Sequence, residues 1–299
     1  MKRAQFDSFF SGLARRHLMR AIKDSLMEDG PDLTSNAVFS PESTLKAVIV
    51  AKEETLLAGA YLIPMILEEC ALEEPGDWSV ENLAQEGELL VPGTVAAKLE
   101  GGARLLLRAE RVILNFITHL SGISNLVRKY VDALEGTGVR LLDTRKTLPG
   151  LRYPEKYAVL VGGGCNHRKN LGEMLMLKDN HIDAAGGIEP AVALLRSAYD
   201  PIPPIEVECR TAEEVVQAVN CNVSRIMLDN MLDSGGPEVM QQALALVPPS
   251  IEVEVSGGVT LDNIRFIAQA GQARKADFIS VGRLTHSAPA ADFSMRISG

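Results

Sequence analysis

Cationic side chains concentrate in one stretch of an otherwise acidic chain. The 299-residue sequence has a formal net charge of −9, yet its segment 145–178 carries a net charge of +5. The cations of this segment are Arg145, Lys146, Arg152, Lys156, Arg168, Lys169 and Lys178. A local excess of positive charge in an acidic protein predicts a site for small anions, because a nucleic-acid-binding protein would need a broadly basic surface.

Two carboxylates end apolar segments further along the chain. Glu208 closes the segment IEVE, and Asp229 closes RIMLD. Carboxylates at such positions suit Mg²⁺ bound to a diphosphate, or hydrogen bonds to ribose hydroxyl groups. The simpler alternative is a salt bridge to Lys146 or Lys178. The two interpretations are compatible, because in an empty site the carboxylates would neutralise the lysines.

Small residues follow two later apolar segments. Ser256-Gly257-Gly258 follows IEVEV and precedes a helix expected to begin at Thr260, and Gly282 follows DFISV. Bare backbone N–H groups near a helix N-terminus favour a phosphate group. The pair of positions predicts a phosphate site to which His286 contributes, although a solvated loop histidine is an equal alternative for His286.

The alternation of short apolar segments with helical patterns predicts the fold that brings these residues together. Strands are expected near 139–143, 174–178, 205–208, 225–229, 251–255 and 277–281, and helices over 188–199, 212–219, 238–247 and 261–270. This order implies a parallel sheet with right-handed crossovers. Because polar residues follow every strand, and not one pair of strands alone, the pattern favours a curled sheet whose rim is the active site. We predict an α/β protein with an incomplete TIM-like barrel of about six parallel strands over residues 116–299.

The preceding residues, 1–115, predict an α+β domain for packing and dimerisation. They contain no cluster of reactive side chains. The expected elements are a helix over 13–27, strands over 45–51 and 56–63, and a strand pair over 89–91 and 94–99 joined by Pro92-Gly93. A long helix then runs from Gly101-Gly102 to Leu134, with a break at Ser121-Gly122.

Three blocks of sequence resemble one enzyme family, the quinolinate phosphoribosyltransferases. The TRKT-PG-R block, the EKYA…GGG-NHR block and the KDNH block occur in this order between Thr144 and His181. The ERVxLNFxxHLSGIS pattern around Arg111 extends the resemblance, which covers most of the chain. One departure is Lys169-Asn170 after NHR, where many members have a glycine at the second position; it leaves the matched cations in place.

The resemblance implies an activity with two anionic substrates. The enzyme, a pentosyltransferase, would transfer phosphoribosyl from 5-phosphoribosyl-1-pyrophosphate to quinolinate with decarboxylation. The products would be nicotinate mononucleotide, pyrophosphate and CO₂, as in de novo NAD biosynthesis. The resemblance also implies a homodimer or higher homo-oligomer, in which the helix carrying Arg111 reaches the active site of a neighbouring subunit.

The same resemblance assigns roles to individual residues. Quinolinate would be held by Arg111, Arg145, His167, Arg168 and Lys178. The catalytic residues would be Lys146 and Lys178 at the leaving pyrophosphate, with Glu208 and Asp229 at the ribose and Mg²⁺. The 5-phosphate would be held by Ser256, Gly257, Gly258, Gly282 and His286. Such a site would act through electrostatics, because lysines stabilise charge growing on the leaving group and carboxylates favour a cation-like ribose carbon.

Other functions remain open at this stage. Lys178 at a strand end also suits the Schiff-base lysine of a barrel aldolase. A related phosphoribosyltransferase could use a different aromatic acid, and a non-catalytic barrel could sense a phosphorylated metabolite. Cys165 and His167 could ligate a metal ion, but a structural zinc site needs four ligands and the sequence offers no others nearby.

Cysteine usage and hydropathy indicate the cellular setting. The four cysteines are scattered without a CxxC pair, as expected of reduced thiols in the cytoplasm. No apolar run approaches the roughly 18 residues that span a bilayer, so we expect no membrane association. The arginine-rich N-terminus could be a mitochondrial transit peptide, but the acids Asp24, Glu28 and Asp29 favour a structural helix.

Overall fold

The computed structural model of this chain divides it into two compact units. It describes residues 1–81, 83–271 and 274–298, with the backbone alone for 232–235. The first unit comprises Met1–Arg128, Thr147–Gly163 and Arg283–Gly299, and the second comprises Lys129–Lys146 and Gly164–Gly282. The predicted domains, 1–115 and 116–299, are continuous ranges, whereas these units interleave along the chain.

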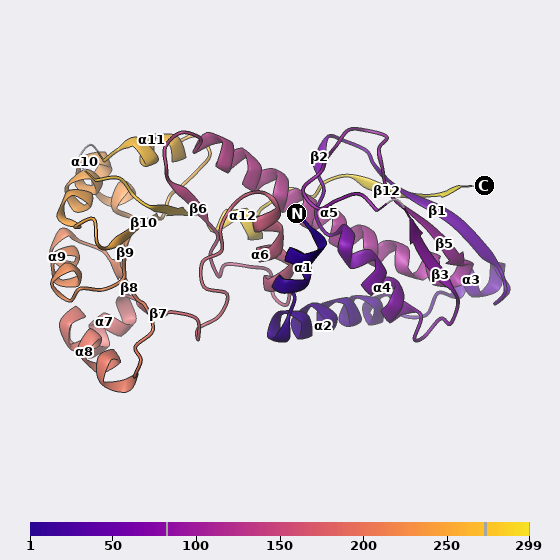
Figure 1. The fold of residues 1–299 in the computed structure, drawn as a ribbon, viewed down its shortest axis with the longest axis horizontal. Coiled ribbons are helices and arrows are strands. Elements are labelled where there is room, and N and C mark those ends of the chain that lie inside the picture. The colour runs from indigo at the N-terminus through magenta and orange to yellow at the C-terminus, as the bar shows by residue number, and fades with distance from the viewer. Residues whose placement is uncertain (82, 272–273, 299) are drawn as a thin grey trace. The chain divides into compact units, whose positions relative to one another are not determined.

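The first unit is built on a four-stranded antiparallel sheet of order β12-β1-β5-β3. Its strands are β12 (Phe293–Ser298), β1 (Thr44–Ala51), β5 (Val95–Gly102) and β3 (Trp78–Glu81). A two-stranded sheet pairs β2 (Thr55–Leu56) with β4 (Leu89–Leu90). The helices are α1 (Arg3–Phe9), α2 (Gly12–Asp29), α3 (Leu33–Val38), η1 (Ala60–Leu62), α4 (Ile63–Cys70), α6 (Arg152–Val161) and α12 (Arg283–His286). The long helix α5 (Ala103–Ala133) begins in this unit, as the ribbon in Figure 1 shows.

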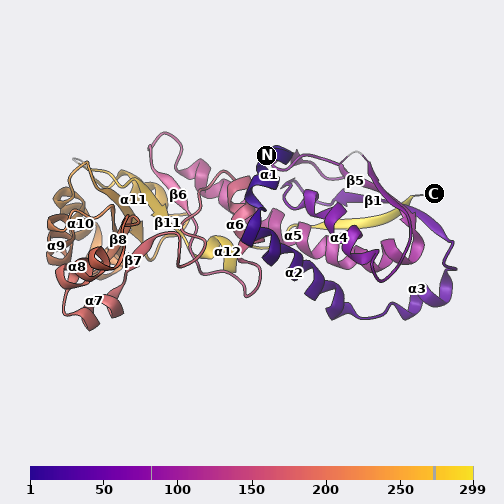
Figure 2. The same ribbon diagram turned by 60° about the horizontal axis from the view of Figure 1, so that its bottom comes forward.

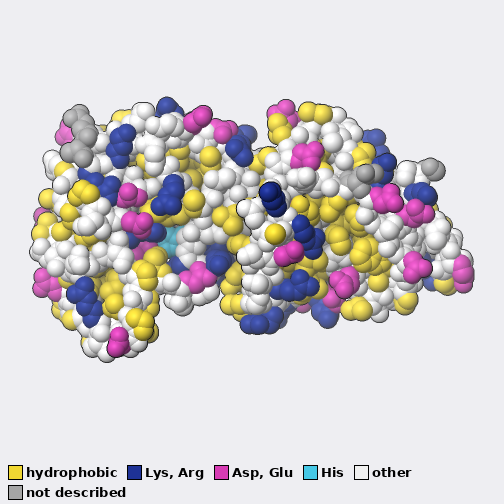
Figure 3. Space-filling view, viewed as in Figure 1, with side chains coloured by type: hydrophobic (Ala, Val, Ile, Leu, Met, Phe, Trp, Pro, Cys, Tyr) yellow, Lys and Arg dark blue, Asp and Glu magenta, His cyan; other side chains and the backbone are white. Residues whose placement is uncertain are grey.

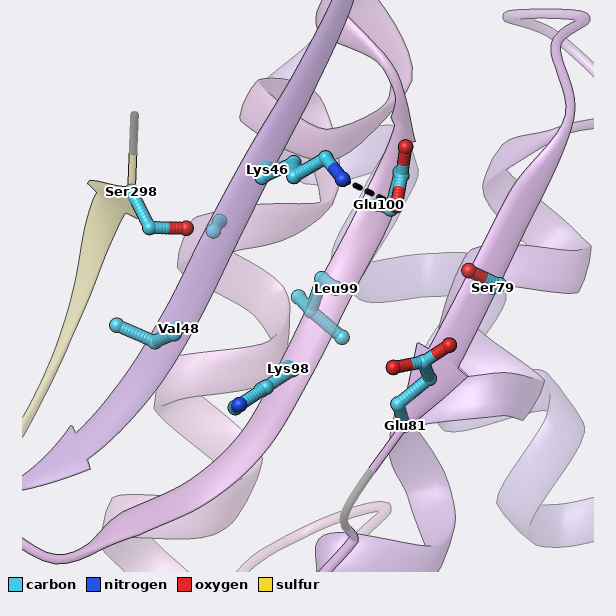
Figure 4. A pocket seen from close by; sticks show the side chains of 9 residues that line it. Lys46, Val48, Ser79, Glu81, Lys98, Leu99, Glu100 and Ser298 are labelled. Atoms are coloured by element: carbon cyan, nitrogen blue, oxygen red, sulfur yellow. Dashed lines mark ion pairs between the residues drawn. The ribbon is translucent and has the colours of Figure 1, made fainter.

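One face of the four-stranded sheet is open, with helices behind it, as Figure 4 shows. A shallow cavity of about 310 Å³ lies on this face. Lys46 on β1 and Glu100 on β5 form an ion pair there, with 3.1 Å between Nζ and Oε2. Both side chains are more than half exposed, so the pair marks a solvated surface and not a reaction centre.

Two strand predictions for the first unit are wrong. The apolar segment 56–63 forms a strand only at Thr55–Leu56 and then continues as η1 and α4. Gly59, at φ 94°, turns the chain, and a proline in the first turn of α4 starts the helix. The segments 89–91 and 94–99 do not pair with each other, because β4 pairs with β2 and β5 lies between β1 and β3.

The predicted break at Ser121-Gly122 is also absent, because α5 is one continuous helix of 31 residues. The Ser121 hydroxyl accepts a hydrogen bond from the Ala58 N–H at 3.0 Å. A Cβ atom on Gly122 would lie 2.0 Å from the carbonyl oxygen of Pro289. These small residues therefore allow close packing against the helix and do not interrupt it.

The second unit is a six-stranded parallel sheet of order β6-β11-β10-β9-β8-β7. Its strands are β6 (Arg140–Leu142), β7 (Leu175–Leu177), β8 (Ile205–Cys209), β9 (Arg225–Asp229), β10 (Glu252–Ser256) and β11 (Phe278–Ser280). All six strands predicted from the sequence are confirmed, and so is the α/β class. The helices α7 (Asp179–Ala185), α8 (Ile188–Ala198), α9 (Ala212–Asn220), α10 (Met231–Leu246) and α11 (Ile264–Gln269) lie along the outer side of this sheet, as the two views in Figures 1 and 2 show.

The inner side of this curved sheet carries charged residues. In β8, Val207 and Cys209 alternate with Glu206 and Glu208, and all four are buried. Alternate residues of a strand point to opposite faces, so both glutamates lie on the same face.

In the part of the chain that the structure describes, no helix combines the length and apolar character needed to cross a bilayer.

Candidate active site

A cavity of about 450 Å³ opens at the carboxyl ends of the strands of the second unit. Basic and acidic side chains gather close to a histidine on the face of this unit shown in Figure 3. The lining residues are Thr144, Arg145, Lys146, His167, Arg168, Met176, Lys178, Glu208, Met227, Asp229, Asn230, Glu254, Ser256, Gly257 and Ser280. The cavity therefore mixes four permanent cations with three carboxylates.

Most of the residues predicted for the site line this cavity. They are Arg145, Lys146, His167, Arg168, Lys178, Glu208, Asp229, Ser256 and Gly257. Gly258 continues the turn that contains Gly257, and Gly282 follows β11 at the same edge of the sheet. Arg111 and His286 belong to the first unit, are exposed, and are not among the residues that line the cavity.

Two partly buried guanidinium groups make one side of the cavity strongly cationic. Burial and, second, repulsion from Arg145 lower the pKa of Arg168. Arg168 Nη1 donates to the carbonyl oxygen of Met174 at 3.0 Å, which holds its side chain in place. Two guanidinium groups held near each other favour a ligand with more than one carboxylate, since each can bind a carboxylate through two hydrogen bonds.

A buried aspartate holds the chain segment that carries His167. Asp143, directly after β6, is fully buried. Its Oδ1 accepts a hydrogen bond from the His167 N–H at 2.8 Å, and its Oδ2 accepts one from Asn166 Nδ2 at 2.7 Å. Cys165 contributes its backbone, which bridges Leu141 and Asp143 with hydrogen bonds of 2.8 and 3.1 Å. Among the described residues, Cys165 belongs to no group of three potential metal ligands.

Lys178 is placed at the cavity by the strand before it and the helix after it. It follows β7 directly and precedes α7, and its N–H donates to Nδ1 of His181 at 3.1 Å. This contact fixes the start of α7 within the KDNH block. The Lys178 ammonium forms an ion pair with Glu208 on the neighbouring strand β8. The predicted salt bridge between Glu208 and Lys178 is thus present.

Glu208 and Asp229 provide oxygen atoms that suit a hard cation. Asp229 Oδ2 accepts a hydrogen bond from Asn230 Nδ2 at 2.7 Å. Burial and, second, the charge of Glu208 raise the pKa of Asp229, while Lys178 and Lys146 act in the opposite direction. Two carboxylates that repel each other, with an amide oxygen and the Ser256 hydroxyl nearby in the cavity lining, form a donor set that fits Mg²⁺.

The Ser256-Gly257-Gly258 turn depends on the absence of side chains. Gly257 has φ 90°, and a Cβ atom there would lie 2.1 Å from Oδ1 of Asn230. The Asn230 N–H donates to the Ser256 carbonyl oxygen at 2.9 Å, so the ends of β9 and β10 are held together. The helix expected from Thr260 begins only at Ile264, because residues 261–263 form a turn. Any phosphate contact at this turn therefore comes from the loop backbone and not from a helix starting at Thr260.

Sequence reasoning missed several residues of the cavity. Thr144, Met176, Met227, Asn230, Glu254 and Ser280 line it, and Asp143 and Glu206 lie beneath it. Alternation along the strands was the available signal, because Met227 and Glu254 are paired across β9 and β10 and therefore share a face. The acidic residues inside the apolar runs IEVEC and IEVEV would have shown that this face is polar.

Comparison with protein families finds one family over nearly the whole chain. Residues 32–121 match a model described as the quinolinate phosphoribosyl transferase N-terminal domain. Residues 123–296 match a model described as the C-terminal domain of the same enzyme.

Individual relatives are similar over similar lengths. A Bacillus subtilis protein named probable nicotinate-nucleotide pyrophosphorylase (carboxylating) is 40% identical over 267 residues, which are 89% of this chain and 88% of that protein. The human nicotinate-nucleotide pyrophosphorylase (carboxylating) is 38% identical over 285 residues, 93% of this chain and 91% of the human protein.

Solved structures are similar in fold as well. The crystal structure of NadC from Streptococcus pyogenes has a TM-score of 0.84 at 35% identity, covering 97% of this chain and all of that chain. The nicotinate-nucleotide pyrophosphorylase from Francisella tularensis has a TM-score of 0.84 at 33% identity, covering 95% of this chain and 96% of that chain.

Proposed function

The chain belongs to the quinolinate phosphoribosyltransferase family, and on that premise we propose that it transfers phosphoribosyl from 5-phosphoribosyl-1-pyrophosphate to quinolinate. Decarboxylation accompanies the transfer and gives nicotinate mononucleotide, pyrophosphate and CO₂. The enzyme is a carboxylating nicotinate-nucleotide pyrophosphorylase of NAD biosynthesis.

One observation supports this function most strongly: two anion-binding groups of different chemistry line the same cavity. Arg145 and Arg168 suit the two carboxylates of quinolinate. Lys178, Glu208, Asp229 and the Ser256-Gly257 turn suit a phosphorylated sugar and its leaving diphosphate. A cavity of about 450 Å³ is within the usual size range for small-molecule sites.

In the reaction, the protein would act through charge and position. The bond between C1 of the ribose and the pyrophosphate breaks while the pyridine nitrogen of quinolinate approaches C1. Lys146 and Lys178 stabilise the charge that grows on the leaving oxygen, and Glu208 and Asp229 favour the cation-like C1. When the neighbouring carboxylate leaves as CO₂, its bonding electron pair stays on the ring carbon, where the positive charge of the ring nitrogen stabilises it. The ring carbon then takes up a proton with this pair.

We further propose Mg²⁺ as the cofactor, held by Glu208 and Asp229. When bound it would neutralise part of the charge of the diphosphate. The ion pair between Lys178 and Glu208 supports this assignment, because the Glu208 carboxylate pairs with a cation at this position. With substrate present, Lys178 would exchange Glu208 for the pyrophosphate.

Two finer proposals concern assembly and location. We propose a homodimer in which Arg111 of one subunit enters the site of the other. Its exposure on α5 supports this, because an unshielded arginine is available to an anionic ligand beyond its own unit. We also propose a cytoplasmic enzyme, since the four cysteines are free thiols and reduced cysteines are typical of that compartment.

The acceptor specificity tests the proposal against its alternatives. The purified protein should be assayed for pyrophosphate release from 5-phosphoribosyl-1-pyrophosphate with quinolinate or with nicotinate, which lacks the second carboxylate. We expect a kcat/KM for quinolinate at least about 100-fold higher, because nicotinate has no second carboxylate to pair with the partly buried arginines. Preference for nicotinate would favour a related transferase, and binding without turnover would favour a sensor. The ion pair that Lys178 makes with Glu208 already disfavours the aldolase, which needs a neutral amine.

A further inference from the structure

Two fully buried glutamates face His167 at the floor of the cavity. Glu206 on β8 and Glu254 on β10 are both 0% exposed. His167 Nε2 lies 3.0 Å from Glu206 Oε2 and 3.6 Å from Glu254 Oε2. Although these distances are short, the N–H is not aligned with either oxygen, and neither carboxylate oxygen of Glu206 has a hydrogen-bond donor among the described residues. Buried carboxylate oxygens are costly without donors, so the carboxylates strongly favour a proton on Nε2.

The opposite nitrogen of the ring is already engaged. His167 Nδ1 accepts a hydrogen bond from the Arg168 backbone N–H at 2.7 Å, so Nδ1 has no proton of its own. The neutral ring therefore has its proton on Nε2, on the side of the glutamates. The imidazole connects Glu206 on β8 with the backbone of Arg168. His167 and Arg168 are both expected to bind quinolinate. Because the Arg168 backbone N–H is bonded to the ring, rotation of the imidazole would displace the Arg168 backbone and the side chain attached to it.

Glu206 and Glu254 differ in their relation to the cavity. Glu254 lines the cavity and has a second partner, because Arg225 Nη1 lies 3.5 Å from its Oε2. The Arg225 guanidinium is itself held 4.3 Å from the centre of the Phe278 ring. Glu206 does not line the cavity, and His167 lies between it and the cavity lining as its nearest described polar partner. Glu206 therefore acts on a bound acid by orienting His167, besides the attraction of its charge for the Arg168 guanidinium.

We propose that Glu206 is a positioning residue for the acid-binding side of the site: it holds His167 in the tautomer with the proton on Nε2 and thereby orients His167 and Arg168. This rests on the proposed function. A divalent cation bound by His167, Glu206 and Glu254 is the competing explanation, since these ligand atoms lie within 4.8 Å of one another. The geometry disfavours it, because the guanidinium of Arg225 already lies against Glu254, and Arg145 and Arg168 add positive charge nearby.

The first test separates the two substrates kinetically. Glu206→Met removes the acceptor at nearly constant volume, whereas Glu206→Gln keeps an acceptor for Nε2–H and can donate its amide to Glu254. We expect Glu206→Met to raise the KM for quinolinate at least about tenfold, with the KM for 5-phosphoribosyl-1-pyrophosphate changed less than about twofold, and Glu206→Gln to restore most of the loss. The matched control is Glu213→Gln, an exposed position on α9 outside the cavity.

The outcomes separate a failure of the positioning role of Glu206 from a failure of the proposed function. If the wild-type protein does not turn over quinolinate, the proposed function fails. If it does, an unchanged KM for quinolinate in Glu206→Met, or an equal change for both substrates, overturns the positioning role alone. The same holds if Glu206→Gln is as impaired as Glu206→Met.

A second measurement needs no buried substitution. Nitrogen NMR of the wild-type protein resolves the tautomer of each of its five histidines, and His167→Asn identifies the signal. We expect a protonated Nε2 and an unprotonated Nδ1 at pH 7.5. A proton on Nδ1, or one equivalent of tightly bound transition metal found by elemental analysis, would overturn the proposal.

Discussion

The ammonium group of Lys178, at the end of β7, forms an ion pair with the carboxylate of Glu208 on the adjacent strand β8. Both side chains line the cavity, so the pair lies where the proposed reaction takes place. Lys178 is 43% exposed, and the pair therefore contributes little to folding stability. The pair is important for function instead, because Lys178 and Glu208 can each leave the ion pair and bind a ligand of opposite charge.

Removal of the cations at the cavity should abolish turnover and leave the fold intact. Arg145→Ala and Lys178→Ala should each lower kcat/KM at least about 100-fold, because neither side chain belongs to a packing layer and both act on substrate charge. Lys169→Ala is the matched control, since Lys169 belongs to the same cationic stretch but lies outside the cavity lining. Circular dichroism should be unchanged in all three variants. Wild-type turnover in either Arg145→Ala or Lys178→Ala would refute the site assignment.

Removal of magnesium should stop the reaction. In excess chelator, with the phosphoribosyl donor supplied free of metal, we expect activity to fall to background and to return when Mg²⁺ is added. Asp229→Asn should raise the Mg²⁺ concentration for half-maximal rate about tenfold, because one anionic oxygen is lost. Full activity in chelator would contradict the role of Glu208 and Asp229 as metal-binding carboxylates.

Arg111 should complement Lys178 across subunits. Arg111→Ala and Lys178→Ala should each be inactive alone, whereas co-expression creates mixed dimers with one intact site. With random pairing about half of the dimers are mixed, so activity should recover to about a quarter of wild type. A mixed preparation with verified heterodimers that remains inactive would mean that Arg111 acts within its own chain or is only structural.

Stability should depend on Glu86 in a pH-dependent way. Glu86 is buried, and its carboxylate oxygens accept hydrogen bonds of 2.9 Å from the backbone N–H groups of Gly59 and Tyr61. Burial raises the pKa of Glu86 from 4.5 to about 7, against the effect of these bonds. The folded state therefore holds a proton that the unfolded state has lost between these values, so this contribution to stability is full below pH 4.5 and is lost as the pH rises through 7.

The variant Glu86→Gln tests this sign. The variant loses one backbone hydrogen bond, so its free energy of unfolding should be lower than that of wild type at pH 5. Wild type loses stability as Glu86 ionises, whereas the variant cannot ionise. The difference between the two proteins should therefore shrink by up to about 3 kcal/mol between pH 5 and pH 8. Denaturant unfolding at both pH values measures the difference. Gln85→Ala, at the exposed neighbouring position, controls for a substitution that removes no ionisable group. A deficit that grows with pH would show that the carboxylate is stabilised in its charged form.

The sequence predicted the second unit better than the first for a physical reason. Its strands are short apolar runs that end in polar residues, such as RIMLD at Asp229. The apolar run and the polar residue at its end therefore indicate the same strand within a few residues of sequence. In the first unit, the distant Pro289 carbonyl explains Gly122 within α5, and β1 pairs with β12 from the far end of the chain. Such long-range contacts leave no signal in a local window, and the strand β12 was not predicted.

The candidate site likewise contains residues that the local sequence indicates and residues that depend on contacts between distant segments. Arg145, Lys178, Glu208 and Asp229 could be predicted as cavity residues because each lies at or just past the carboxyl end of an apolar strand. Glu206 could not, since its importance arises from the approach of His167, which lies on a different segment of the chain. Asn230 was missed because its role depends on the backbone of Gly257, one strand away.

The stoichiometry of one reaction tests the proposed activity. Purified protein should be incubated with Mg²⁺, 5-phosphoribosyl-1-pyrophosphate and quinolinate labelled in the carboxylate next to the ring nitrogen. We expect quinolinate to disappear while labelled CO₂, pyrophosphate and nicotinate mononucleotide form in equal amounts, and Lys178→Ala to form none of them. A nucleotide that keeps the label, or quinolinate that is not consumed, would contradict the proposed activity.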